Sequence, residues 1–173
     1  MSKINGIYAA SVSILDENLK LDIHKTIRHA ENLIKSGCHG VVIFGSTGQS
    51  QLISLEEKFE LIQNISKSIF KDKFIIGTGL NSLQDTISLI KISNSYNFNN
   101  FLIMPPAYYM YEDKDVIRFY IKLIEKLSNC KIILYNFEKL SGYKFSKESV
   151  EKLASLFPEN IIGVKDSSYN LFE

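Results

Sequence analysis

The sequence is poor in the features that mark membrane, nucleic-acid-binding and disulfide-rich proteins. It has only two cysteines in 173 residues, and no run of about 18 or more apolar residues that could cross a membrane. Its 20 basic and 19 acidic residues nearly cancel, which leaves a formal net charge of +1. Such a chain has no broad electrostatic field to attract nucleic acid or an anionic membrane. We therefore expect neither as a partner.

Cysteine and histidine are also too sparse and too scattered to build a metal site. Cys38 and Cys130 form no CxxC pair, and two small buried thiols in a reducing compartment are favoured over a disulfide. The three histidines, His24, His29 and His39, lack spacings such as HxH or HExxH. We expect no metal ion and no bound cofactor.

The N-terminal segment 4–15 is fairly apolar and loosely resembles a signal peptide, with the small residues Ala9 and Ala10 near its middle. Polar Asn5 and Ser11 interrupt it, however, and charged residues follow at once. We interpret the segment as the first strand of the fold, and we expect a cytoplasmic protein.

Strand-like and helix-like segments alternate along the whole chain. The strand candidates are short, rich in Ile, Val and Phe, and almost continuously apolar, as buried parallel strands are. Strict alternation with right-handed crossovers predicts an α/β protein with a parallel sheet. The expected strands are Gly6–Ser11, Gly40–Phe44, Phe74–Gly77, Asn100–Met104, Lys131–Tyr135 and Ile161–Val164.

Helix starts can be recognised between these strands from their capping residues. Asp22 can cap a first helix, Ser54-x-x-Glu57 forms a capping-box pattern, and Ser82 can cap a third helix. The apolar spacing of the second helix continues to Ile69. The expected helices cover 23–36, a segment from Ser54, a segment from Ser82, Asp113–Ser128 and Ser146–Phe157, the last closed by Pro158.

Two connections are longer than the rest, and both follow the carboxyl ends of expected strands. They are Gly45–Leu55, which is polar, and Pro105–Asp113, which is aromatic. Parallel α/β proteins place their ligand sites at this edge of the sheet. We therefore seek the functional site there, although both loops could also serve an interface.

A lysine, Lys165, ends the last apolar segment. An apolar cavity would favour its neutral amine, which can attack a carbonyl and form a Schiff base. The alternative is a lysine that leaves the strand for solvent while its stem covers apolar surface. On this segment alone the second case is the commoner one, because most lysines are exposed.

Hydroxyl groups follow several of the other strands. The loop Gly45-Ser46-Thr47-Gly48-Gln49-Ser50 can cradle a carboxylate or be a plain tight turn, and it lacks the Gly-Lys-Ser/Thr ending of a nucleotide-binding P-loop. Tyr135 can be a reactive phenol or a core tyrosine with a satisfied hydroxyl. For Tyr109 and Tyr111 we favour aromatic packing.

Together these positions are far more specific than any one of them. The chain resembles the pyruvate-dependent class I aldolase family that includes N-acetylneuraminate lyase and dihydrodipicolinate synthase. The resemblance runs from about Gly6 to the C-terminus. It rests on Gly45-Ser46-Thr47-Gly48, Gly77-Thr78-Gly79-x-Asn81-Ser82, Pro106-Ala107-Tyr108, Leu134-Tyr135-Asn136 and Gly163-Val164-Lys165.

The resemblance implies a Schiff-base aldolase or lyase with two small-molecule partners, pyruvate and an aldehyde. Lys165 would condense with the ketone of pyruvate or another 2-oxo acid, and the protonated imine would act as an electron sink. Tyr135 would shuttle protons, Ser46 would hydrogen-bond Tyr135, and Tyr108 would extend the relay. The family also suggests a homotetramer.

The substrate carboxylate would be held by the glycine-containing loop. The resemblance assigns this task to Ser46, Thr47 and Gly48, through hydroxyl and backbone N–H donors. The family's usual acidic residue after this loop is replaced by Gln49.

Two further departures bear on the substrate. Glu138 displaces the proline that usually follows the Tyr-Asn pair. Leu140 stands where synthases of the lysine pathway carry an arginine, which disfavours recognition of a second carboxylate there. Because Leu140-Ser141-Gly142 looks more like the lyase pattern, we expect an N-acetylneuraminate-lyase-like enzyme acting on a sugar-derived 2-oxo acid. The alternatives are 4-hydroxy-tetrahydrodipicolinate synthase activity, or a non-catalytic remnant that binds a 2-oxo acid.

The chain is short for the fold that the resemblance implies. A (β/α)8 TIM barrel needs roughly 250 residues, whereas this sequence ends eight residues after Lys165. We expect residues 1–173 to form one incomplete (β/α)8 barrel domain, truncated after about the sixth strand. It would be a fragment of a longer protein, or a partner chain would complete the barrel.

Overall fold

A computed structural model shows the protein at residues 4–127 and 129–170, with six strands in one parallel sheet. The strand order is β1-β2-β3-β4-β5-β6, so each strand pairs with the next one in sequence. All six expected strands are present. Their bounds are β1 (Tyr8–Ala10), β2 (Gly40–Ile43), β3 (Phe74–Gly77), β4 (Asn100–Ile103), β5 (Lys131–Asn136) and β6 (Ile161–Asp166).

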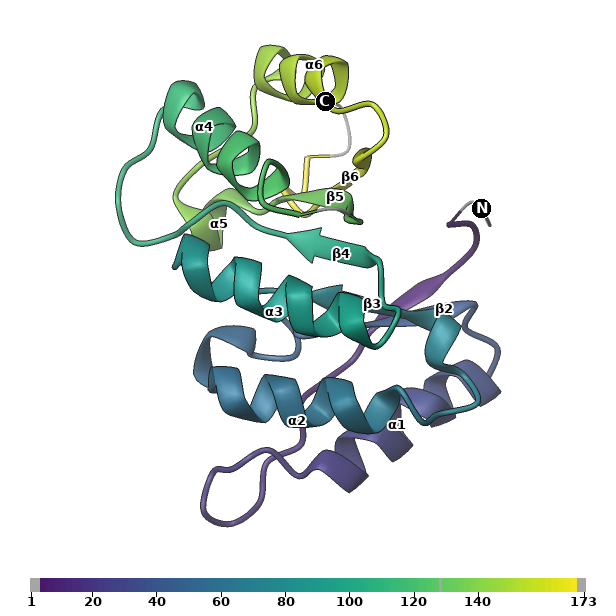
Figure 1. Ribbon diagram of the computed structural model, residues 1–173. Coiled ribbons are helices and arrows are strands. Elements are labelled where there is room, and N and C mark those ends of the chain that lie inside the picture. The colour runs from purple at the N-terminus through teal and green to yellow at the C-terminus, as the bar shows by residue number, and fades with distance from the viewer. Residues whose placement is uncertain (1–3, 128, 171–173) are drawn as a thin grey trace.

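The helices form a layer along one side of this sheet (Figure 1). Contacts run from α1 to α2, from α2 to α3, from α3 to α4 and from α4 to α6, so the layer follows the order of the strands. The helices are α1 (Ile23–Lys35), α2 (Leu55–Ile65), α3 (Leu83–Ser95), α4 (Asp113–Ile124), α5 (Glu138–Ser141) and α6 (Lys147–Leu156).

The capping residues begin the helices as predicted. The Asp22 side chain accepts a hydrogen bond from the Lys25 backbone N–H, and Ser54 and Glu57 form both halves of a capping box. Ser82 and Ser146 accept from the third residue of α3 and α6 in the same way. Each bond satisfies a backbone donor that the helix itself leaves free.

Two helix ends and one whole helix differ from the predictions. α2 ends at Ile65, so Ile69 lies beyond the helix and is exposed. α4 ends at Ile124, and the expected end at Ser128 lies outside the described residues. The one-turn helix α5 was not predicted, because four residues are too few to show helical periodicity.

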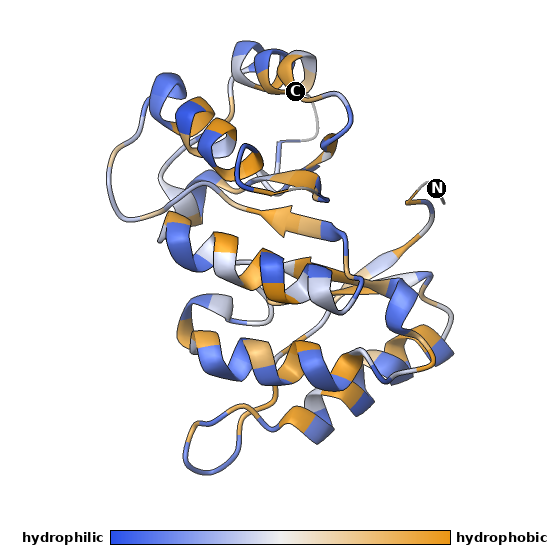
Figure 2. Cartoon of the chain, in the orientation of Figure 1, coloured by the Kyte–Doolittle hydropathy of each residue, from blue (hydrophilic) through white to orange (hydrophobic). Residues whose placement is uncertain are grey.

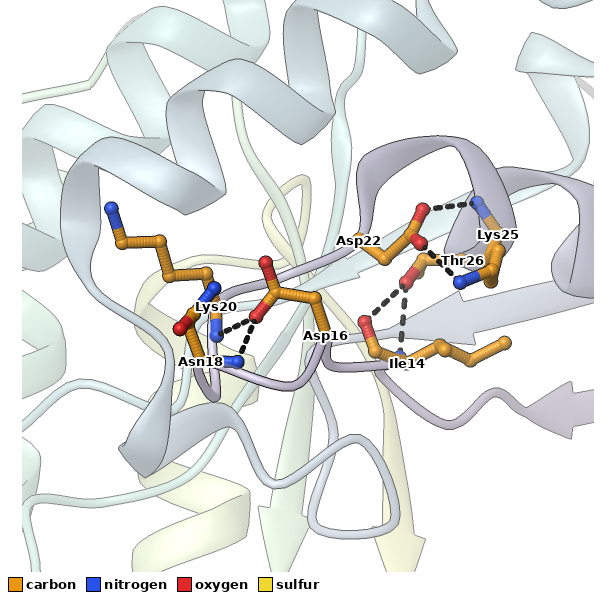
Figure 3. A network of polar contacts seen from close by, with 7 residues as sticks. All are labelled: Ile14, Asp16, Asn18, Lys20, Asp22, Lys25 and Thr26. Carbon is orange, nitrogen blue, oxygen red and sulfur yellow. Dashed lines mark hydrogen bonds and ion pairs between the residues drawn. The ribbon is translucent and has the colours of Figure 1, made fainter.

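The segment between β1 and α1 is shaped by side chains that bond to nearby backbone (Figure 3). The Asp16 carboxylate accepts from the backbone N–H groups of Asn18 and Lys20, at 2.8 and 2.9 Å. The Ile14 N–H donates to the hydroxyl of Thr26 in α1 at 3.0 Å. These bonds close a compact loop and fix where α1 starts.

Much of the sheet is coloured hydrophobic in Figure 2, and the buried apolar residues form two clusters. The larger cluster fills the space between the helices and the sheet. A smaller cluster on alternate strand positions consists of Val42, Ile75, Leu102 and Tyr135, and it belongs to the other face. This second face leads to the carboxyl edge of the sheet, where the candidate site lies.

Among residues 4–127 and 129–170, no helix is both long and apolar enough to cross a membrane. Nor does any group of three or more His, Cys, Asp or Glu residues in these ranges lie close enough together to hold a metal ion.

Candidate functional site

The carboxyl edge of the sheet brings Ser46, Tyr135 and Lys165 together. Ser46 follows β2, Tyr135 lies near the end of β5, and Lys165 lies near the end of β6. In the parallel pairing of β5 with β6, Tyr135 and Lys165 are direct partners. Because paired residues in neighbouring strands point to the same face, both side chains reach the same site.

Tyr135 is the centre of this arrangement. Its side chain is only 4% exposed, and its hydroxyl lies 2.8 Å from the Ser46 hydroxyl, although 89 positions separate the two residues in sequence. The Lys165 amine lies 3.8 Å from the centre of the Tyr135 ring. The predicted contact between Ser46 and Tyr135 is therefore present, and Lys165 is held beside the same ring.

The environment of Tyr135 makes its phenol more acidic than usual. Burial by itself raises the pKa of Tyr135, because it disfavours the phenolate. Hydrogen bonds with Lys165, Ser46 and Ser167, together with the positive charge of Lys165, act in the other direction and lower the pKa overall. A phenol of lowered pKa is suited to take up and release protons during a reaction.

Ser167 also belongs to the site, although it was not among the predicted site residues. The Lys165 amine donates a hydrogen bond to the Ser167 hydroxyl at 3.0 Å. The same hydroxyl helps to lower the pKa of Tyr135. A signal was available, because residues two apart in a strand share a face, and Ser167 is two residues after Lys165.

The end of β6 is fastened to the end of β5 by a second pair of residues. The Asn136 side-chain amide donates to the Asp166 carboxylate at 2.5 Å. The Ser167 backbone N–H donates to the carbonyl of Asn136 at 2.8 Å, and the Phe145 N–H donates to the Asn136 side-chain oxygen at 3.2 Å. These bonds fix the position of Lys165 relative to Tyr135.

The loop that carries Ser46 depends on a close approach of two backbones. Phe44, which ends the buried run of β2, has a φ of +55°, an unusual value for a residue other than glycine. A β-carbon at Gly77, at the end of β3, would lie 2.4 Å from the Phe44 carbonyl oxygen. Only glycine fits there, so Gly77 allows the turn that directs Ser46 toward Tyr135.

The predicted carboxylate-binding residues differ in their surroundings. Thr47 is exposed, whereas Gly48 is buried and its carbonyl accepts a hydrogen bond from the Ser13 hydroxyl at 2.6 Å. Within the described part of the chain, the backbone N–H groups of Ser46, Thr47 and Gly48 donate to no other residue. Free N–H groups in a turn can bind an anion, but whether these do so stays a prediction.

A cavity of about 240 Å³ opens beside Ser46 and Tyr135. Lys165 is not in its lining, since the amine lies against the face of the Tyr135 ring. No charged side chain lines the cavity within residues 4–127 and 129–170. The lining residues are Phe44, Gly45, Ser46, Gln49, Ser50, Gln51, Leu52, Gly79, Leu102, Met104, Ala107, Tyr135 and Leu140.

Tyr108 does not join the other predicted catalytic residues. Its side chain is 88% exposed, and among the described residues its hydroxyl bonds to neither Tyr135 nor Ser46. Its ring packs edge-on against Tyr109, which in turn packs edge-on against Tyr111. The aromatic packing expected for Tyr109 and Tyr111 is present, and the relay role of Tyr108 stays a prediction.

Comparison with known proteins shows one family. Residues 3–173 match the model of the "Dihydrodipicolinate synthetase family". A 4-hydroxy-tetrahydrodipicolinate synthase of Listeria monocytogenes serotype 4b (strain CLIP80459) is 34% identical over 158 residues, which are 90% of this chain and 52% of the relative. The chain thus spans about half the length of the curated relatives it matches.

Solved structures share the fold. A dihydrodipicolinate synthase from Agrobacterium tumefaciens str. C58 superposes with a TM-score of 0.89 at 26% identity, over 95% of this chain and 59% of that one. A prophage protein of E. coli K12 from the dihydrodipicolinic acid synthase family, in complex with pyruvate, gives a TM-score of 0.86 at 25% identity, over 98% and 56%. The predicted fold, six strands of a (β/α)8 barrel, is confirmed. The chain belongs to the dihydrodipicolinate synthetase family.

Proposed function

We propose that this protein forms a Schiff base between Lys165 and pyruvate, or a related 2-oxo acid, and uses it to make or break a carbon–carbon bond. One observation carries the proposal: the Lys165 amine lies 3.8 Å from the ring centre of a buried tyrosine whose hydroxyl lies 2.8 Å from Ser46. A nucleophilic amine beside a phenol of lowered pKa is what imine chemistry requires.

The residues can be given definite tasks. The unprotonated Lys165 amine attacks the ketone carbon of the 2-oxo acid, and one proton moves from its nitrogen to the former ketone oxygen. The phenol of Tyr135 donates a second proton to that oxygen, which leaves as water. Tyr135, now a phenolate, can take a proton from the adjacent methyl carbon, which converts the protonated imine into an enamine. The enamine carbon then attacks the aldehyde, and the reverse sequence breaks the same bond.

The carboxylate of the 2-oxo acid would bind at the turn after β2. The N–H groups of Ser46, Thr47 and Gly48 have no partner among the described residues, and this supports the placement, because backbone donors in a turn act as a fixed positive site. The solved structure of the prophage protein from E. coli K12 covers 98% of this chain and is a complex of that protein with pyruvate.

The cavity beside Tyr135 supports one class of aldehyde partner over another. Its described lining carries no charge, and Leu140 stands in it where an arginine would bind a second carboxylate. The side-chain amides of Gln49 and Gln51 can instead hydrogen-bond hydroxyl groups. We therefore favour an uncharged, sugar-derived aldehyde, and thus an N-acetylneuraminate-lyase-like reaction.

A second candidate is 4-hydroxy-tetrahydrodipicolinate synthase activity. The observation that favours it is the name carried by the relative from Listeria monocytogenes, which is 34% identical. The two candidates share the Schiff base and differ only in the aldehyde. Supplying pyruvate with an aldose, or with an aldehyde that carries a carboxylate, separates them by which one is consumed.

Borohydride trapping tests the Schiff base itself. Incubation with pyruvate and borohydride should add the mass of one reduced adduct, and Lys165→Ala should abolish it. Lys139→Ala is the matched control, because Lys139 lies on the neighbouring helix α5, its amine 4.9 Å from the ring centre of Tyr169, and should leave the adduct intact. An adduct that persists in Lys165→Ala contradicts the proposal, and no adduct in the unaltered chain supports a non-catalytic remnant.

A further inference from the structure

The loop after β4 forms part of the cavity wall, but it is attached to the rest of the protein at a single polar point. Its residue Ala107 lines the cavity together with Ser46 and Tyr135. Among the described residues, the segment 105–111 makes one hydrogen bond, in which the Ala107 N–H donates to the side-chain oxygen of Asn81 at 2.8 Å. The bond joins two loops that lie 26 positions apart in the sequence.

The local sequence makes this one bond important. Pro105 and Pro106 have no backbone N–H, so Ala107 offers the first backbone donor after Met104. The next residue, Tyr108, has a φ of +86°, a left-handed conformation that is uncommon for a bulky side chain. Such a backbone persists only where the surrounding structure holds it, and the bond at Ala107 is directly adjacent.

Asn81 itself sits on a closely packed turn after β3. Two residues before it, Gly79 has a φ of +54°, and a β-carbon there would lie 2.2 Å from the Ser50 hydroxyl oxygen. The Ser50 hydroxyl donates to the carbonyl of Thr78 at 3.1 Å, and Ser82, the residue after Asn81, caps α3. Asn81 therefore ties the loop after β4 to a part of the protein that is already fixed.

We propose that Asn81 is a positioning residue, whose bond to Ala107 holds the loop against the cavity and thereby sets the affinity for the aldehyde. The inference rests on the proposed function, which places the aldehyde in this cavity, and it deepens that function. The Schiff base would form at Lys165 beside Tyr135, and in the described ranges neither residue bonds to Asn81. Loss of the bond should therefore weaken aldehyde binding and spare the reaction with pyruvate.

Limited proteolysis tests the attachment of the loop without any substrate. Chymotrypsin cuts after aromatic residues, and Tyr108 and Tyr109 are 88% and 66% exposed. Asn81→Ala should speed cleavage there about three- to tenfold, the range that one hydrogen bond is worth, because the released loop opens more often. Asn81→Asp keeps an acceptor oxygen and should stay within about twofold of the unaltered chain. The matched control is Asn64→Ala, since Asn64 donates to the Glu60 carbonyl within its own helix.

Steady-state kinetics test the link to the aldehyde. Pyruvate is kept saturating while mannose or glyoxylate is varied, whichever of the two the unaltered chain consumes. Asn81→Ala should raise the KM for that aldehyde about three- to tenfold, and Asn81→Asp should restore it. The rate of the borohydride-trapped pyruvate adduct should stay within about twofold in all three proteins, because the reacting residues are untouched. Thermal unfolding shows that each variant remains folded.

The outcomes separate this inference from the proposed function. Equal cleavage of the unaltered chain and Asn81→Ala would overturn the inference, and so would faster cleavage with no change in the KM for the aldehyde. Slower adduct formation in Asn81→Ala would also overturn it, because the bond would then support the whole site. A chain that forms the adduct but consumes neither aldehyde would overturn the inference and spare the Schiff base. Absence of any adduct in the unaltered chain would overturn the proposed function, and the role in aldehyde binding with it.

Discussion

The two sides of the site are built in different ways. β2 and β3, which lead to Ser46 and its loop, are buried at every position. In β6, which carries Lys165, no residue is fully buried, and Ile162 and Val164 are 43% and 45% exposed. Tyr135 in β5 touches both sides, through the Ser46 hydroxyl and the Lys165 amine.

This difference shows that one site can be positioned by two kinds of force. Close packing fixes the serine side, where a β-carbon at Gly77 would lie 2.4 Å from the Phe44 carbonyl oxygen. Directed hydrogen bonds fix the lysine side, where Asn136 bonds to Asp166 and the Ser167 N–H bonds to Asn136. Among the described residues no strand pairs with the other edge of β6, so these bonds carry more of the positioning.

The largest expected effect comes from removing the group that joins the two sides. Tyr135→Phe should slow formation of the borohydride-trapped adduct by about 10²- to 10⁴-fold, because the proposed proton donor is lost. Tyr143→Phe is the matched control. It removes a second buried phenol, which donates to Asp113 at 2.8 Å outside the site, so it should lower stability and spare the rate. Similar losses of rate in both variants would contradict a special role for Tyr135.

A pair of glycines tests the difference in packing directly. Gly77→Ala should destabilise the protein by about 3 kcal/mol, because its β-carbon would meet the Phe44 carbonyl at 2.4 Å. Gly163→Ala in β6 should be close to neutral, because a β-carbon there meets no atom within 4 Å. Urea unfolding of both variants gives the comparison. Equal destabilisation would show that the two strands are packed alike.

A buried lysine on the closely packed side predicts a pH dependence. Lys58 in α2 is fully buried, 5.8 Å from the centre of the Phe44 ring, and its amine has no hydrogen-bond partner among the described residues. Burial lowers the pKa of Lys58 to about 8, although the negative charges of Asp85 and Glu57 raise it in part. In the unfolded chain Lys58 keeps its proton up to about pH 10.5. As the pH rises from about 8 to 10.5, the folded protein loses this proton first, so the free energy of unfolding increases, by at most about 3 kcal/mol.

Lys58→Met isolates that effect. The variant should be more stable than the unaltered chain at pH 7, by about 1–3 kcal/mol, because it buries no charge. This difference in stability should shrink as the pH rises from about 8 to 10.5, because Lys58 in the unaltered chain then loses its charge. Thermal unfolding of both proteins across this range measures the gap. A gap that does not change with pH would show that Lys58 does not titrate there.

The smallest expected effect is a change in the titration of one phenol. The amine of Lys165 helps to lower the pKa of Tyr135, so Lys165→Met should raise that pKa. The titration of Tyr135 is obtained from phenolate absorbance, as the difference between each protein and its Tyr135→Phe variant. Lys139→Met should leave it unchanged. A pKa that stays the same or falls in Lys165→Met would contradict the contact between the two side chains.

The sequence was sufficient to predict the strands and most of the helix starts, because these depend on local patterns. The strand Phe74–Gly77 has the predicted bounds, and Ser54 with Glu57 forms the predicted capping box. The meeting of Ser46 and Tyr135 was implied by the family resemblance, and both residues lie at the carboxyl edge of the same parallel sheet. The strands and the helix caps are determined by residues close together in the sequence, and the contact between Ser46 and Tyr135 depends on the topology of the sheet.

The features that were missed depend on packing or on the direction of single side chains. Lys58 shares its helix face with Leu61, Ile62 and Ile65, so its spacing predicts an inward position. Only the packed structure shows that its amine has no hydrogen-bond partner among the described residues. The contact of Ser167 depends on how the Lys165 side chain turns. Strand alternation predicts which face of the sheet Ser167 occupies, but it does not predict which side chain Ser167 bonds to.

The most direct test of this account is to find which lysine carries the reduced pyruvate. The chain is incubated with pyruvate and borohydride, digested, and its peptides are sequenced by tandem mass spectrometry. The account predicts the modification at Lys165, held beside Tyr135, and none at comparable level on exposed lysines such as Lys139. A modification found on another lysine, or spread evenly over exposed lysines, would contradict it.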